Sequence, residues 1–120
     1  MSKTILVVDD SATDRRLITD ALTGQGYEIL TAKDGEEALE IAGQHLPQLV
    51  LLDIVMPGKN GFQVCRQIKS GAETRDTRVV LVSSKTQESD RFWGMKQGAD
   101  GYLTKPFDDS ELLATVAELL

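Results

Sequence analysis

Short apolar runs rich in β-branched residues alternate along this chain with longer stretches in which apolar residues recur at helical spacing. The runs predict strands over residues 4–8, 28–32, 49–53, 79–82 and 101–104. Apolar residues at i, i+3 and i+4 predict helices over residues 12–24, 35–45, 61–70, 86–97 and 110–120. Five strand–helix units in this alternation predict a doubly wound α/β domain with a five-stranded parallel sheet and five helices.

Both faces of the predicted strands are apolar, which places helices on each side of the sheet. Residues 49–52, LVLL, show this pattern clearly. The first predicted helix has one apolar face toward the sheet, formed by Leu17, Ile18, Ala21 and Leu22. Candidate N-caps precede three of the helices, at Ser11, Asp34 and either Asp108 or Asp109.

The segment 86–97 is the least regular of the predicted helices, because Gly94 interrupts it. Three large apolar residues belong to this segment: Phe92, Trp93 and Met95. Their side chains cannot all point inward from one short helix, so Trp93 is a candidate for partial exposure.

The composition limits the chemistry that this domain performs. The 120 residues fit one compact domain, with a formal net charge of −6 and 41% hydrophobic residues. An acidic chain without a run of Lys or Arg is a poor candidate for nucleic-acid binding, and no apolar stretch is long enough for a bilayer span. A single cysteine, Cys65, excludes an internal disulfide, and a single histidine, His45, argues against a histidine metal site. Because the N-terminus has no signal-peptide pattern, we expect a cytoplasmic protein that works through carboxylates.

Three aspartates follow two strands that are expected to be neighbours. Asp9 and Asp10 come directly after the first strand, and Asp53 ends the third. With the strand order 2-1-3-4-5, taken from a common class of doubly wound proteins, the first and third strands lie side by side where the order reverses. Three carboxylates then converge, and they either trap protons or bind a cation. Oxygen ligands without His or Cys suit a hard divalent ion, so the sequence predicts a Mg²⁺ site.

Two further polar residues are expected at the same edge of the sheet. Ser83 follows the fourth predicted strand, and Lys105 follows the fifth. A lysine and a hydroxyl that face Mg²⁺ and a carboxylate form a receptor for a phosphoryl group. The pattern predicts that Asp53 is a nucleophile that forms an acyl phosphate, with Mg²⁺ and Lys105 stabilising the transferred group.

Other interpretations of the same residues stay open at this point. Asp9 and Asp10 can serve only as charges at a helix N-terminus, and Asp53, Lys105 or Ser83 taken alone can be an ordinary strand-end or surface residue. A Mg²⁺-dependent phosphatase with an aspartyl nucleophile would use the same groups, but it would need a general acid/base and a substrate cap. A flavodoxin-like FMN carrier would share the fold, but acids after its first strand would repel the phosphate.

The motifs VVDDS, LLDIVMPGKNGF, VSS and YLTKPF resemble those of the CheY-like receiver domains of two-component signalling. The resemblance covers essentially the whole chain, and the spacing agrees, with Ser83 and Lys105 at 83 − 53 = 30 and 105 − 53 = 52 residues after Asp53. It implies one receiver domain over residues 1–120 that acts as a switch and not as an enzyme. Its only catalysis would be its own phosphorylation and dephosphorylation. Because Leu120 comes soon after the expected end of the fifth helix, we expect no output domain. The alternative is a receiver fragment of a larger response regulator that controls transcription or another output.

The resemblance also implies a role for each site residue. Asp53 would accept the phosphoryl group from a histidine kinase of the CheA-like class. Asp10, Asp53 and the backbone carbonyl of Val55 would ligate Mg²⁺, or Mn²⁺ in its place. Asp9 would act on the ion through water. Lys105 would contact the phosphoryl oxygens, and the peptide bond that follows it would be cis.

Ser83 and Tyr102 match the switch pair of the family. On phosphorylation, the hydroxyl of Ser83 would move toward the phosphoryl oxygen, and Tyr102 would turn inward. This would change the surface formed by the fourth helix, the fifth strand and the fifth helix, where Trp93 is a candidate contact for a protein target. Val55 and Lys85 lie where the family tunes the lifetime of the phosphate. Neither is an acid or amide that would readily position an attacking water, which predicts slow dephosphorylation.

A narrower resemblance lies in the segment KTQESDRFWGMKQGADGYLTKPF. In it, Trp93 and Gly94 are followed, after Met95, by the residues KQGA at 96–99. This segment resembles the PilH-type regulators of type IV pilus twitching motility. It implies chemotaxis-like or twitching motility signalling through contact with a protein partner. We expect no nucleic-acid partner and no membrane insertion, and a monomer or a weak dimer.

Overall fold

The structure, a computed structural model, describes residues 3–84 and 87–120. At its centre is a parallel sheet made of β1 (Thr4–Val8), β2 (Glu28–Ala32), β3 (Leu49–Asp53), β4 (Arg78–Ser83) and β5 (Gly101–Thr104). The strand order is β2-β1-β3-β4-β5, which confirms the expected order. β4 is longer than predicted by one residue at each end, because Arg78 pairs with Leu49 and Ser83 pairs with Thr104.

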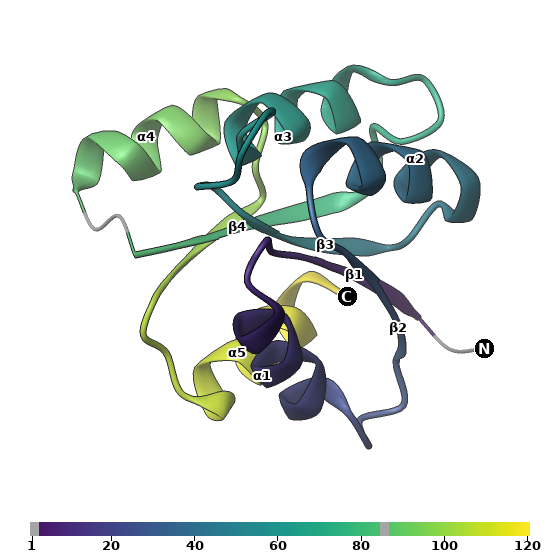
Figure 1. The fold of residues 1–120 in the computed structure, drawn as a ribbon, viewed down its shortest axis with the longest axis vertical. Coiled ribbons are helices and arrows are strands. Elements are labelled where there is room, and N and C mark those ends of the chain that lie inside the picture. Colours follow the sequence, from purple (N-terminus) through teal and green to yellow (C-terminus); the bar gives the residue numbers. More distant parts are fainter. Residues whose placement is uncertain (1–2, 85–86) are drawn as a thin grey trace.

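Helices cover both faces of the sheet (Figure 1). They are α1 (Ala12–Leu22), α2 (Gly35–His45), α3 (Gly61–Ser70), α4 (Glu88–Lys96) and α5 (Asp109–Leu119). α1 and α5 lie together on one face, and α2, α3 and α4 lie on the other. This is the doubly wound α/β fold that the alternation of strands and helices predicts. Within the described residues, none of the helices has the length and apolar character needed to cross a membrane.

Polar side chains cap the N-termini of four helices. Ser11, Asp34 and Asp108 each accept a hydrogen bond from the backbone N–H three residues further along the chain. They confirm the predicted caps and select Asp108 over Asp109, which is the first residue of α5. Asn60 caps α3 in the same way and completes a capping box. These caps determine where each helix begins after the loop that leaves its strand.

The core lies on both sides of the sheet. Successive residues of β1 point to opposite faces, so Leu6 and Val8 join the cluster beneath α2 and α3, while Ile5 and Val7 join the cluster beneath α1 and α5. Cys65 of α3 is fully buried in the first cluster. Burial raises the pKa of its thiol to about 11, so it packs as a small apolar residue and is not a nucleophile at neutral pH.

Leu17 is an exception to the predicted core, because its side chain is 63% exposed. Ile18 and Leu22 are buried and occupy the face of α1 that packs on the sheet. Leu17 lies one position earlier, which turns its side chain about 100° away from that of Ile18. The prediction that Leu17 faces the sheet is therefore wrong.

A buried glycine forms the inward side of α4. A Cβ at Gly94 would lie 2.6 Å from Cδ1 of Leu81, so a larger residue there would force the side chain of Leu81 to move, whereas glycine lets the helix lie close to β4 without that shift. Because Gly94 occupies the inward face, the large apolar residues beside it point outward. The exposed fractions of Phe92, Trp93 and Met95 are 62%, 54% and 48%. Trp93 is thus exposed as proposed from the sequence, and its two apolar neighbours share that exposure.

Candidate functional site

The two central strands bring three aspartates to one edge of the sheet. β1 and β3 are neighbours, and the helices that follow them, α1 and α3, lie on opposite faces, so the strand order reverses between them (Figure 1). Asp9 follows β1 directly, Asp10 comes next, and Asp53 is the last residue of β3. Ligands of open parallel sheets bind in the crevice beyond the carboxyl ends of the strands at such a reversal. The fold therefore places the predicted acids where a binding crevice forms.

The three carboxylates form a tight cluster. Oxygen atoms of Asp9, Asp10 and Asp53 lie within 4.8 Å of one another. Asp9 and Asp53 are 1% and 6% exposed, whereas Asp10 is exposed to solvent. Burial raises the pKa of Asp53 to about 6, and the negative charge of Asp9 adds to this shift, while the positive charge of Lys105 opposes it. The predicted convergence of the three acids is confirmed, and their mutual repulsion is offset only in part.

Hydrogen bonds hold the carboxylate of Asp9 in place. Its Oδ1 accepts a bond from the backbone N–H of Ser11 at 2.9 Å, and its Oδ2 accepts one from Nζ of Lys105 at 2.9 Å. Nη1 of Arg15 donates to the backbone carbonyl of Asp9 at 2.7 Å. Because Ser11 is the N-cap of α1, the orientation of Asp9 is set by the first turn of that helix.

Lys105 reaches the aspartates from the loop after β5. Its Nζ lies 2.9 Å from Oδ2 of Asp9, 3.0 Å from Oδ2 of Asp14 and 3.9 Å from Oδ1 of Asp53. Burial alone lowers the pKa of an ammonium group, but two carboxylate hydrogen bonds and the charge of Asp53 outweigh it, so the pKa of Lys105 is raised. The lysine is a permanent cation beside Asp53 at neutral pH. The bond between Lys105 and Pro106 is cis, as the family resemblance implies.

Ser83 and Tyr102 lie next to each other at the end of β4 and on β5. Ser83 is the last residue of its strand and not the first residue after it, and it is 1% exposed. Burial raises the pKa of Tyr102, and a hydrogen bond with the side chain of Ser83 opposes this shift without cancelling it. Arg91 of α4 lies over the tyrosine ring, with Cζ 5.0 Å from the ring centroid. The predicted switch pair is therefore in contact, and it connects the end of β4 with α4.

The donor set of the cluster fits a hard divalent cation. All three donors are carboxylate oxygens, and a bound cation would stabilise the ionised form of Asp53, whose pKa is raised. The backbone N–H of Val55 forms a hydrogen bond with Asp53, which places Val55 beside the cluster. Its role as a carbonyl ligand stays a prediction. Lys85, which we expected to affect the phosphate lifetime, lies outside the described residues.

Asp14 is a site residue that the sequence analysis does not single out. It lies in the first turn of α1, and its backbone N–H donates to Oγ of Ser11 at 3.2 Å. Its carboxylate accepts a hydrogen bond from Lys105, although 91 positions separate the two residues. The sequence offered only a weak signal, because Asp14 is an acid in the first turn of the helix that follows Asp9 and Asp10.

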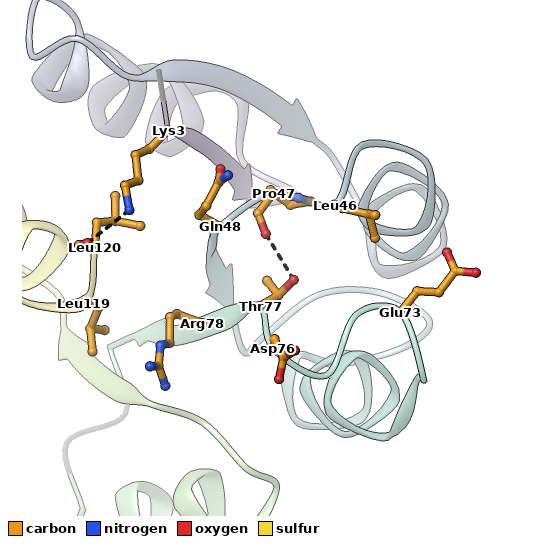
Figure 2. A pocket seen from close by; sticks show the side chains of 10 residues that line it. All are labelled: Lys3, Leu46, Pro47, Gln48, Glu73, Asp76, Thr77, Arg78, Leu119 and Leu120. Atoms are coloured by element: carbon orange, nitrogen blue, oxygen red, sulfur yellow. Dashed lines mark hydrogen bonds between the residues drawn. The ribbon is translucent and has the colours of Figure 1, made fainter. Parts of the chain in front are cut away.

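Two hollows border the sheet, and one of them adjoins the carboxylates. A cavity of about 460 Å³ lies between α1 and the connection from β5 to α5, where Leu17, Phe107 and Lys105 are part of its wall. The other, of about 370 Å³, lies at the opposite edge, where the strands begin (Figure 2). There, Nζ of Lys3 donates to the backbone carbonyl of Leu120 at 3.3 Å. Of the two, only the first shares residues with the aspartate site.

The raised pKa of Asp53 should make the stability of the metal-free chain depend on pH. Its pKa is about 6 in the folded chain against an ordinary value of 3.8, so the folded state binds more protons than the unfolded state between these values. The contribution of this carboxyl group to the free energy of unfolding therefore falls as the pH rises through about 6. In EDTA, Asp53→Asn should be more stable than wild type by about 2 kcal/mol at about pH 7.5, and most of this difference should be lost near about pH 4. Urea denaturation at both pH values measures it, and an equal difference at the two would contradict the prediction.

A protein-family model and several known proteins match the sequence of this chain. The family model described as the response regulator receiver domain matches residues 5–117. Protein PilH of Pseudomonas aeruginosa is 47% identical over 116 residues, which are 97% of this chain and 96% of PilH. Response regulator PleD of Caulobacter vibrioides is 46% identical over 119 residues, which are 99% of this chain but only 26% of PleD.

Solved structures show the same architecture. The chemotaxis protein CheY4 of Vibrio cholerae has a TM-score of 0.95 with this chain at 31% sequence identity, and the match covers 100% of both chains. The fold predicted from the alternation of strands and helices is thus confirmed.

Proposed function

Because the chain belongs to the response regulator receiver domain family, we propose that it is a switch operated by transfer of a phosphoryl group from a histidine kinase to Asp53. One observation carries the proposal: Asp53 is buried at the end of β3, beside two further acids and 3.9 Å from the ammonium of Lys105. The chain would act as a phosphoacceptor, and the only reactions it promotes would be its own phosphorylation and dephosphorylation.

The carboxylate of Asp53 is the nucleophile of the proposed reaction. One of its oxygens attacks the phosphorus of a phosphohistidine, so that an O–P bond forms while the P–N bond breaks. The imidazole of the kinase leaves with the electron pair of that bond and takes up a proton. The product is an acyl phosphate on Asp53, which water later hydrolyses to the free carboxylate and inorganic phosphate.

Metal binding is assigned to the carboxylate cluster. Asp10, Asp53 and the backbone carbonyl of Val55 would hold Mg²⁺, with Asp9 acting through water, and Mn²⁺ would suit the same oxygen donors. When bound, the ion neutralises part of the negative charge on the phosphoryl oxygens. The distances of at most 4.8 Å between carboxylate oxygens and the raised pKa of Asp53 support this assignment.

Lys105 supplies a second positive charge for the phosphoryl group. Its Nζ already lies 2.9 Å from Asp9 and 3.9 Å from Oδ1 of Asp53, so a phosphoryl oxygen on Asp53 would come within its reach. A charge-assisted hydrogen bond from this ammonium would stabilise the negative charge of the transferred group.

Ser83 and Tyr102 would convert the charge change into a change of surface. The side chain of Ser83 is hydrogen-bonded with Tyr102, and a phosphoryl group on Asp53 would offer Ser83 a stronger, charged acceptor. Movement of Ser83 toward that group would leave space into which Tyr102 turns, away from Arg91 of α4. We expect the altered surface of α4, β5 and α5 to bind the target, with the exposed Trp93 in contact.

The partners are proposed from the relatives. PilH matches over 96% of its own length, which favours a CheA-like kinase as the donor and a protein target in chemotaxis-like or twitching motility signalling. PleD matches over 26% of its length, so a receiver within a larger regulator of transcription or another output is the alternative. We further propose that the chain acts in the cytoplasm as a monomer or weak dimer.

Intact mass after incubation with acetyl phosphate tests the proposed function. With Mg²⁺, wild type should gain the mass of one phosphoryl group, and EDTA should prevent the gain. Hydroxylamine should remove the group, because it cleaves acyl phosphates but not phosphoserine. No gain with acetyl phosphate or with phosphoramidate, or steady hydrolysis of an aryl phosphate, would contradict the proposal.

A further inference from the structure

Lys105 makes a carboxylate contact that the proposed chemistry does not use. Its Nζ donates to Oδ2 of Asp14 at 3.0 Å and to Oδ2 of Asp9 at 2.9 Å, whereas Oδ1 of Asp53 is 3.9 Å away. The lysine side chain is only 22% exposed. The ammonium is therefore held by two acids and lies beside a third that it does not hydrogen-bond.

The ammonium of Lys105 has more N–H groups than Asp9 and Asp14 together use. A lysine ammonium carries three N–H groups, and Asp9 and Asp14 accept from two of them. The third is left for a group attached to Asp53. With Asp9 as its only partner, an ammonium on a flexible four-carbon chain could turn about that single contact. Asp14 supplies the second contact, which fixes the direction of the third N–H.

The backbone of Asp14 is anchored at the start of α1, so its half-exposed carboxylate reaches Lys105 from a fixed point. Its backbone N–H is bonded to the N-cap Ser11, and the helix that carries it packs on the sheet through the buried Ile18. The described acids that lie at metal-binding distances from one another are Asp9, Asp10 and Asp53, so the cluster does not include Asp14. Its position suits the lysine and not the cation.

We propose that Asp14 is a positioning residue that directs the ammonium of Lys105 toward the phosphoryl group on Asp53. The inference rests on the proposed function and adds a residue to it. Removal of Asp14 leaves the charge of Lys105 in the site but not its orientation. The rate of phosphoryl transfer should then fall, while the affinity for Mg²⁺ is preserved.

The test compares phosphorylation by acetyl phosphate in the wild-type chain, Asp14→Ala and Asp14→Asn. The maximal rate should fall about tenfold in Asp14→Ala and less in Asp14→Asn, which keeps an acceptor oxygen, while the Mg²⁺ concentration for half-maximal rate stays within about twofold. Asp20→Ala is the matched control, because Asp20 lies on the same helix in an exposed ion pair with Arg16 at 3.7 Å. This control should leave both quantities unchanged.

A second background separates positioning from a general effect on the fold. In the Lys105→Met background, adding Asp14→Ala should cause little further loss of the phosphorylation rate, because Asp14 acts through Lys105. A full tenfold loss in that background, equal rates in wild type and Asp14→Ala, or a Mg²⁺ shift as large as the rate loss would each overturn the inference. A wild-type chain that takes no phosphoryl group would instead overturn the proposed function, and this inference with it.

Discussion

Asp53→Asn is expected to accept no phosphoryl group from acetyl phosphate, even at saturating Mg²⁺. The amide has no anionic oxygen to attack phosphorus, although its shape closely matches that of the carboxylate. The fold should survive, because the change removes a charge from a cluster whose repulsion and burial raise the pKa of Asp53. Intact mass measures the loss of labelling, and circular dichroism checks that the variant is folded.

An acid outside the cluster provides the control for this variant. Asp76 is exposed and lies at the opposite edge of the sheet, in the wall of the hollow in Figure 2. Asp76→Asn makes the same chemical change and should be labelled like wild type. Undiminished, hydroxylamine-labile labelling of Asp53→Asn would move the nucleophile to Asp9 or Asp10.

The acidic cluster could be predicted from the sequence because it depends on a simple geometric rule. The apolar runs locate the ends of β1 and β3, and parallel strands bring their carboxyl ends to one edge. Asp9, Asp10 and Asp53 then meet whatever the details of packing are. The strand order itself came from the class of fold, since the local pattern of apolar residues does not state which strands are neighbours.

Features that depend on tertiary contacts could not be predicted in this way. Leu17 satisfies the helical pattern but lies just off the face of α1 that packs on the sheet. Gly94 interrupts the helical pattern in the sequence, although it is the residue at which α4 contacts the sheet. The contact between Asp14 and Lys105 joins residues 91 positions apart. No local rule connects two such residues, because the contact exists only after α1 and β5 have taken their places.

Gly61→Ala is expected to destabilise the fold by about 3 kcal/mol, although it adds a single methyl group. A Cβ at this position would lie 2.7 Å from Cα of Ile54 and 3.0 Å from the carbonyl carbon of Asp53, and it would overlap the carbonyl oxygen of Asp53. These are backbone atoms at the end of β3, and they cannot yield as the tip of a side chain can. The N–H of Gly61 also donates to the carbonyl of Ile54 at 2.9 Å, which holds α3 at this close approach.

The same contact connects stability to the proposed chemistry. The atoms that a methyl group at position 61 would displace are the backbone carbonyl of Asp53 and Cα of Ile54, so relief of the clash moves the nucleophile relative to Asp9 and Lys105. We expect the folded fraction of Gly61→Ala to take up phosphoryl groups about tenfold more slowly than wild type, since small misplacements of reacting groups have large effects on rate.

Gly43→Ala is the control for Gly61→Ala, because it adds the same methyl group to a helix glycine whose Cβ position is open. Gly43 lies in α2, is exposed, and has no heavy atom within 4 Å of the position a Cβ would take. Alanine should therefore stabilise the chain there by up to about 1 kcal/mol, through helix propensity alone. Urea denaturation of the two variants should give changes of opposite sign. Changes of the same sign would mean that the close approach of α3 to Asp53 is not what requires glycine at position 61.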